Sequence, residues 1–191
     1  GKGVVRLRSL VANAVAGANC PVPRTYFTHY YKRFLQFMNE PAITSNDIVM
    51  LGNSLTEGGG DWGKRLGKDN VINRGISGDV AMGIYDRLHQ ILPGKPKKIF
   101  LLIGVNDISH DLSTDSIVQM IEKNVTRIQR ESPETKLYLQ SLLPIDESFN
   151  RYKKLTNKTY QIPEINDRLK ALAKEKKIDF IDLYPLFTEK G

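Results

Sequence analysis

Short apolar runs alternate along this chain with longer stretches in which apolar residues recur every three or four positions. The short runs predict strands, and the longer stretches predict helices with one buried face. Five strands are expected, at Ile48–Leu51, Val71–Ile72, Ile99–Ile103, Leu137–Ser141 and Ile178–Asp182. The third run is apolar throughout, which is typical of a central strand in a parallel sheet.

Three helical stretches follow the second, third and fourth apolar runs. Their apolar positions are Ile84, Leu88 and Ile91, then Ile117, Ile121, Val125 and Ile128, then Ile162, Ile165, Leu169 and Leu172. Asp79 and Ser113 stand at expected N-cap positions, and Pro163 fits a first helical turn. A further helix is expected from Tyr26 to Asn39, ahead of the first strand.

Strands that alternate with helices predict βαβ units, whose right-handed crossovers place helices on both faces of a parallel sheet. The expected fold class is α/β, a three-layer α/β/α sandwich with a five-stranded, flavodoxin-like parallel sheet. Residues 1–45 are expected to form an N-terminal arm and lead-in helix, and residues 46–191 the α/β domain. Ligands bind such sheets at the carboxyl ends of the strands, so motifs directly after a strand are the functional candidates.

Composition changes this picture little. The 191 residues suit one globular domain, with 40% hydrophobic and 26% charged residues. The net charge of +7 would allow an acidic partner, but the Lys and Arg residues are scattered and no aromatic residues interleave with them. That distribution argues against nucleic acid as a partner. No apolar run approaches the roughly 18 residues of a membrane span.

The N-terminal stretch Lys2–Cys20 places basic residues before an apolar segment and so resembles a signal peptide weakly. Its apolar core is short and interrupted by Asn13, and an ordered arm or a short helix fits it equally well. Cys20 is the single cysteine, which excludes an intramolecular disulfide and a multi-cysteine metal site.

Polar groups follow each of the first three predicted strands. Ser54, in the turn Gly52–Glu57, places a hydroxyl nucleophile at the carboxyl edge of the sheet. The glycines of Asn73–Asp79 leave a backbone N–H exposed at a helix start, and Asn106 offers a side-chain amide to a developing oxyanion. Each is also explained alone as an N-cap, a plain βα turn or an Asx turn. Together they favour a nucleophile with oxyanion donors.

With these blocks the chain resembles the SGNH (GDSL) hydrolase superfamily over approximately residues 46–187. The matching blocks are Gly52–Leu55, the glycine of Ile76–Asp79, and Gly104–Asp107. Their spacing, together with Trp62 and the segment Arg87–Gln90, is most similar to the platelet-activating-factor acetylhydrolase-like and carbohydrate acetylesterase-like branches.

The resemblance implies a serine esterase that hydrolyses short-chain, chiefly acetyl, esters of a carbohydrate or lipid through an acyl-enzyme. Ser54 would be the nucleophile, and the amides of Ser54 and Gly78 with the side chain of Asn106 would form the oxyanion hole. Asn53 replaces the usual aspartate at a supporting position. A small-molecule ester is the implied partner, with neither a metal nor an organic cofactor. The resemblance leaves a homodimer and the localisation open, with secretion or the periplasm favoured over the cytoplasm.

The family's closing Asp-x-x-His block, which supplies the general base and its orienting carboxylate, has no counterpart after the fifth predicted strand. We therefore expect the 191 residues to lack the C-terminal catalytic segment and to be weakly active. His29 and His89 are expected to be structural or exposed. His110 lies on the loop after the third strand, but the family places its base on the opposite side of the nucleophile.

Two other classes of function compete with the esterase. A ligand-binding module derived from an esterase would also lack the base, and a flavodoxin-like nucleotide-binding or signalling domain shares the architecture. The latter needs phosphate-binding glycines after the first strand, or an acidic cluster, and the sequence has neither. Gly58–Arg65 approximates a phosphate-binding loop, but no strand ends before it and Arg65 replaces the required Ser or Thr. We expect an entrance loop there, with Trp62 either lining a pocket or stapling a helix at Asp61–Leu66.

Overall fold

A five-stranded parallel sheet in the order β2-β1-β3-β4-β5 forms the centre of the protein. The computed structural model describes residues 2–15, 23–24, 26–145 and 153–187. The strands are β1 (Ile48–Gly52), β2 (Val71–Gly75), β3 (Lys98–Leu102), β4 (Lys136–Gln140) and β5 (Asp179–Ile181). All five predicted strands are confirmed, and so is the flavodoxin-like order.

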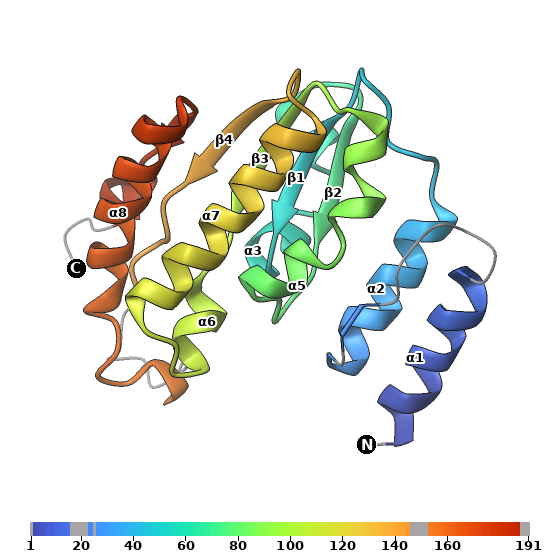
Figure 1. Cartoon of the computed structure of the whole chain (residues 1–191), viewed down its shortest axis with the longest axis horizontal. Coiled ribbons are helices and arrows are strands. Elements are labelled where there is room, and N and C mark those ends of the chain that lie inside the picture. The colour runs from blue at the N-terminus through green and yellow to red at the C-terminus, as the bar shows by residue number, and fades with distance from the viewer. Residues whose placement is uncertain (1, 16–22, 25, 146–152, 188–191) are drawn as a thin grey trace.

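Helices lie on both faces of this sheet, as the α/β/α expectation requires. They are α1 (Lys2–Val15), α2 (Thr28–Asn39), α3 (Ser54–Gly58), α4 (Trp62–Leu66), α5 (Ala81–Tyr85), α6 (Val105–Ser109), α7 (Thr114–Glu131) and α8 (Gln161–Lys176). Figure 1 shows α5 and α7 in front of the strands, α3 behind them, and the pair α1 and α2 to one side, beyond β2.

The main core forms where one face of the sheet meets α5, α7 and α8. Alternate strand positions point to this face, and the helices contribute rows of apolar residues at helical spacing. The buried strand residues are Val49, Leu51, Ile99, Leu101, Leu137 and Leu139. Each such side chain contributes roughly 1.5–3 kcal/mol by leaving water.

Three helices are predicted after the second, third and fourth strands. The last two are confirmed, and the first is shorter than predicted. α7 begins after Ser113, whose Oγ accepts the N–H of Ser116 at 3.1 Å, and α8 carries Pro163 in its first turn. The stretch from Ile84 to Ile91 is not one helix, because α5 ends at Tyr85 and two 3₁₀ turns follow, at Leu88–Gln90 and Leu92–Gly94.

The reason for the early end of α5 is a buried arginine. Arg87 has non-helical backbone angles (φ −122°, ψ 6°), and its fully buried guanidinium contacts the ends of β1 and β2. The prediction that Asp79 is the N-cap is also wrong. The N-cap is Val80, and the Asp79 carboxylate pairs with Arg87.

The N-terminal helices pack on each other around a second apolar cluster. Its buried members are Val11, Tyr30, Tyr31, Phe34, Phe37 and Ile76. The helix predicted at Tyr26–Asn39 is confirmed and starts at Thr28. Of the stretch Lys2–Cys20, the part up to Val15 is helical, while Cys20 lies outside the described residues. The division at residue 45 stays a prediction.

No helix among the described residues is long and apolar enough to cross a membrane.

Candidate active site

The three predicted blocks leave the sheet at the same level. Gly52, the last residue of β1, is in register with Gly75 of β2 and with Leu102 of β3. Because the strands are parallel, the segments that follow these residues emerge together at the carboxyl edge. The topology therefore brings the blocks of Ser54 and Asn106 to one edge of the sheet.

Ser54 is the first residue of α3 and is exposed. Asn53 before it is buried and acts as the N-cap, since its Oδ1 accepts the N–H of Leu55 at 3.3 Å. Asparagine thus holds the turn that carries the hydroxyl.

Gly78 stands at an exposed turn after β2 with φ +87°, a backbone conformation that suits glycine. A side chain here would also meet a neighbour, because a Cβ atom would lie 3.2 Å from Cζ of Phe27.

Asn106 lies in α6, directly after β3, and is half-buried. Its Nδ2 donates a hydrogen bond of 2.9 Å to the carbonyl oxygen of Asp79, in the turn that contains Gly78. An amide nitrogen carries two N–H groups, so one donor remains after this bond. The bond also fixes the side chain relative to the Gly78 turn.

A cavity of about 520 Å³ brings Gly78 and Asn106 together. Its lining is Phe27, His29, Ser77, Gly78, Asn106, Ser109, His110 and Lys154. Within the described residues, Ser54 is not part of this lining and stands on the neighbouring α3.

Glu57, three residues after Ser54 in α3, connects that helix to the cavity. Its carboxylate accepts hydrogen bonds from Nε2 of His29 at 2.6 Å and from the N–H and Oγ of Ser77 at 3.2 and 3.1 Å. It also pairs with Nε of Arg33 at 3.2 Å. Partial burial alone would raise the pKa of Glu57, but the hydrogen bonds from His29 and Ser77 outweigh it and lower the pKa.

Arg87 connects the ends of β1 and β2 to Asp79 by hydrogen bonds. Its Nε donates to Oδ2 of Asp79 at 3.0 Å, its Nη1 to the carbonyl oxygen of Arg74 at 2.8 Å, and its Nη2 to that of Gly52 at 3.1 Å. Both members of the Asp79–Arg87 ion pair are fully buried. Burial raises the pKa of Asp79 to about 6, although Arg87 opposes that rise.

A second buried carboxyl, Asp107, fixes the start of α5. Its two carboxylate oxygens accept a hydrogen bond from the N–H of Ala81, at 3.3 and 3.2 Å. Burial raises the pKa of Asp107 to about 7. Asn106 and Asp107 therefore hold both sides of the turn between Gly78 and α5.

The three histidines differ in their surroundings. His29 and His110 line the cavity with Gly78, and His29 is in addition bound to Glu57. His89 lies in a 3₁₀ turn against the ring of Phe34, and burial lowers its pKa. In the part of the chain that the structure describes, no group of three or more His, Cys, Asp or Glu side chains is arranged to hold a metal ion.

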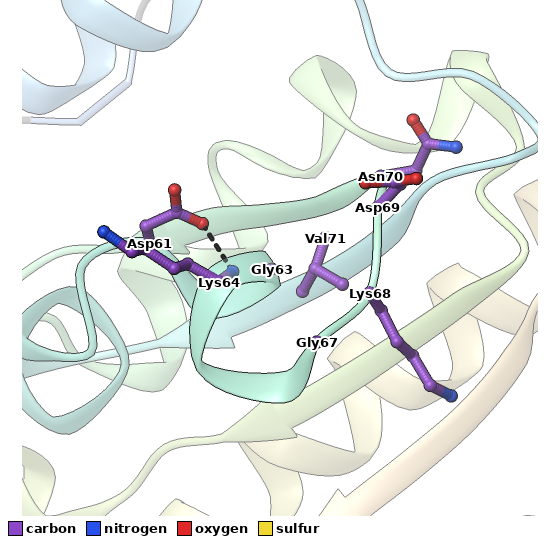
Figure 2. Close-up of a pocket in the computed structure, with 8 residues that line it drawn as sticks. All are labelled: Asp61, Gly63, Lys64, Gly67, Lys68, Asp69, Asn70 and Val71. Carbon is purple, nitrogen blue, oxygen red and sulfur yellow. Dashed lines mark hydrogen bonds between the residues drawn. The ribbon is translucent and has the colours of Figure 1, made fainter.

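The glycine-rich segment before β2 does not form a phosphate loop. Three of its residues, Asp61, Gly63 and Lys64, line a separate hollow of about 480 Å³ with residues 67–71. This hollow lies at the amino end of β2, the sheet edge opposite the candidate site. Figure 2 shows Asp61 there, with its carboxylate accepting the N–H of Lys64 at 2.9 Å as the cap of α4. Trp62 fastens α4 to α3, since its Nε1 donates to the carbonyl oxygen of Thr56 at 2.7 Å.

Sequence reasoning missed Phe27, His29 and Glu57 as parts of the site. His29 and Arg33 are spaced four apart on a predicted helix, and Glu57 lies three residues after Ser54, so each pair shares a helix face. That spacing predicts that the residues of each pair lie on one face of a helix, but it does not predict that the two helix faces contact each other. Arg87 entered only through the resemblance.

Comparisons with known proteins identify the family and support the fold. The model of the GDSL-like Lipase/Acylhydrolase family matches residues 50–191. The platelet-activating factor acetylhydrolase IB subunit beta homolog of Drosophila melanogaster is 25% identical over 135 residues, which are 68% of this chain and 58% of that protein. The chain thus spans less than two thirds of that relative's length.

Two solved structures share the fold. A Bacteroides fragilis protein assigned to the acylhydrolases is 26% identical, with a TM-score of 0.68, over 84% of this chain and 79% of its own. A Streptococcus pneumoniae protein named for platelet activating factor is 23% identical, with a TM-score of 0.72, over 95% of this chain and 82% of its own. On the match of the family model, this chain belongs to the GDSL-like lipase/acylhydrolase family.

Proposed function

We propose that this protein is a serine esterase that hydrolyses short-chain acyl esters, chiefly acetyl esters, of a carbohydrate or lipid. The observation that carries the proposal is the shared cavity of Gly78 and Asn106, at the sheet edge from which Ser54 emerges. A backbone N–H, which Gly78 has, and a side-chain amide, which Asn106 has, are the kinds of donor that an acyl-transfer oxyanion needs.

In the proposed reaction, Oγ of Ser54 attacks the ester carbonyl carbon and gives up its proton to a base. The carbonyl oxygen becomes an oxyanion, which the amides of Ser54 and Gly78 and Nδ2 of Asn106 stabilise. Collapse of this intermediate breaks the bond to the alcohol oxygen, and the alcohol leaves with the proton. Water then attacks the acyl-enzyme, which releases the carboxylic acid and restores Ser54.

The buried network has a positioning role in this proposal. Arg87 links the carbonyl oxygen of Gly52, two residues before Ser54, to Asp79, the residue after Gly78. Asn106 is held by the same turn. Fixed donors need no reorganisation when the oxyanion forms, which is the condition for a large electrostatic contribution to the rate.

The general base is the component that the resemblance assigns to an Asp-x-x-His block, which the 191 residues do not contain after β5. We propose that this form hydrolyses esters slowly. Binding and an oxyanion hole without the base still leave roughly 10³–10⁴-fold acceleration over water in serine hydrolases.

Hydrolysis of 4-nitrophenyl acetate tests the proposal. The 191-residue chain, its Ser54→Ala variant and a version extended to include an Asp-x-x-His block would be compared. Rapid turnover by the extended version, with loss of turnover when Ser54 is replaced in it, supports the esterase. An extended version that is inert, or equally active with Ser54→Ala, contradicts it and favours a non-catalytic ligand-binding module.

A further inference from the structure

The start of α2 and the residue before it lie outside the region that the family model matches, yet they form part of the candidate cavity. The match covers residues 50–191, whereas Phe27 and His29 line the cavity with Gly78 and Asn106. The ring of Phe27 lies directly against Gly78, since a Cβ atom at Gly78 would be 3.2 and 3.4 Å from its Cζ and Cε2 atoms. An aromatic ring therefore stands beside the proposed oxyanion donor.

Phe27 differs in chemistry from the rest of the lining. Apart from Gly78, the other described lining residues carry hydroxyl, amide, imidazole or ammonium groups. A carbonyl group bound at Gly78 and Asn106 has two substituents, an apolar acyl chain and a more polar alcohol. The apolar chain matches the ring of Phe27, and the alcohol matches the polar groups of the other lining residues.

A buried tyrosine packs against the Phe27 ring. Tyr30, which is fully buried, meets it edge-on with the ring centroids 6.0 Å apart and the planes at 73°. The hydroxyl of Tyr30 donates to the carbonyl oxygen of Gly83 at 2.7 Å, so this backing is itself fixed.

The flanking residues are anchored as well. The hydroxyl of Tyr26 donates to Oδ2 of Asp86 at 2.7 Å, and His29 is bound to Glu57 at 2.6 Å. Phe27 is thus placed between two anchored neighbours. The backbone that carries Phe27 is therefore held at Tyr26 and at His29.

We propose that Phe27 determines the size of the acyl group, because its ring stands beside Gly78 in the cavity lining and occupies space that a longer acyl chain would need. This inference rests on the proposed esterase function. It assigns the choice of acyl group to a residue that precedes the family-matched region.

Binding of product carboxylates tests the inference independently of any turnover. Acetate, butyrate and hexanoate would be titrated into ¹⁵N-labelled chain, and the shift of the Gly78 amide signal would give a dissociation constant for each. In Phe27→Ala, the affinity for hexanoate relative to acetate should rise about tenfold or more over that of the unaltered chain, as expected when space opens for several methylenes. Phe27→Leu, which keeps an apolar group there, should give a smaller rise.

Lys32→Ala, an exposed position of α2, is the matched control and should leave the ratio unchanged. The amide spectrum itself reports whether each variant is folded. If the Gly78 amide signal shows the same chain-length preference in the unaltered chain and in Phe27→Ala, the role of Phe27 is overturned and the proposed function is not. Absence of a Gly78 shift with every carboxylate in both forms would instead overturn the oxyanion hole, and the proposed function with it.

Discussion

Replacement of Arg87 by Met should be one of the most destabilising single changes in the protein. The guanidinium is fully buried, pairs with the equally buried Asp79, and donates to the carbonyl oxygens of Gly52 and Arg74. Met removes the positive charge and leaves the carboxylate of Asp79 in an apolar surrounding without its partner. Breaking one side of a buried pair costs about 3–5 kcal/mol.

Asp79 supplies the diagnostic second perturbation. In Asp79→Asn with Arg87→Met, neither member of the pair is left charged without its partner, so the double variant should lose less stability than the sum of the two single losses. A coupling energy of about 1–3 kcal/mol is expected for groups in direct contact. The pKa of Asp79 is already raised to about 6 by burial, and loss of Arg87 should raise it further. Protonation then relieves the unpaired charge, so the deficit of Arg87→Met should shrink from pH 7 to pH 5.

Urea unfolding with linear extrapolation measures these free energies. Arg130→Met is the matched control, since that side chain is 64% exposed and its replacement should change stability little. A loss below about 1 kcal/mol for Arg87→Met, or strictly additive single and double losses, would refute the reasoning, because the pair would then be uncoupled.

Three further changes test other parts of the account. Gly78→Ala should lower stability by about 1–3 kcal/mol and slow ester hydrolysis, because alanine would be strained at a φ of +87° and its Cβ would lie 3.2 Å from Phe27. Thermal melting measures the stability and initial rates measure the hydrolysis. An unchanged melting temperature would contradict the predicted strain. Asn106→Ala should lower ester hydrolysis about 10²–10³-fold, and an unchanged rate would exclude it as an oxyanion donor. Asp107→Asn should flatten the pH dependence of stability. The pKa of Asp107 is raised to about 7, so the folded state holds the proton more tightly, and stability present below about pH 4 is lost as pH rises to 7. Urea unfolding at pH 4 and at pH 7 should show that the unaltered chain loses of the order of 4 kcal/mol of stability between the two, a loss that Asp107→Asn lacks. An equal change of stability with pH in both proteins would contradict the raised pKa of Asp107.

The strands and the long helices could be predicted because their evidence is local. Ile99 to Ile103 is an unbroken apolar run, and the row Ile117, Ile121, Val125 and Ile128 has helical spacing, so period alone identifies them. The same holds for the positions of Ser54, Gly78 and Asn106, which follow from the rule that parallel strands end at one edge.

What the sequence alone did not reveal depends on contacts between distant segments. Periodicity continues through Leu88 and Ile91, yet the helix stops at Tyr85 because Arg87 turns inward to carbonyl groups 13 and 35 residues away. The bond between His29 and Glu57 joins residues 28 positions apart. Such partnerships are fixed by tertiary packing, which overrides local propensity.

Covalent labelling of Ser54 tests the central claim most directly. The chain extended to include an Asp-x-x-His block, which supplies the base that activates the hydroxyl, would be incubated with a fluorophosphonate and analysed by intact mass and peptide mapping. Its Ser54→Ala variant and the matched control Ser45→Ala, an exposed serine ahead of β1, would be treated in the same way. We expect one added group, on the peptide that contains Ser54, in the extended chain and in its Ser45→Ala variant but not in Ser54→Ala. Labelling that persists in Ser54→Ala, or that maps to another residue, would contradict it.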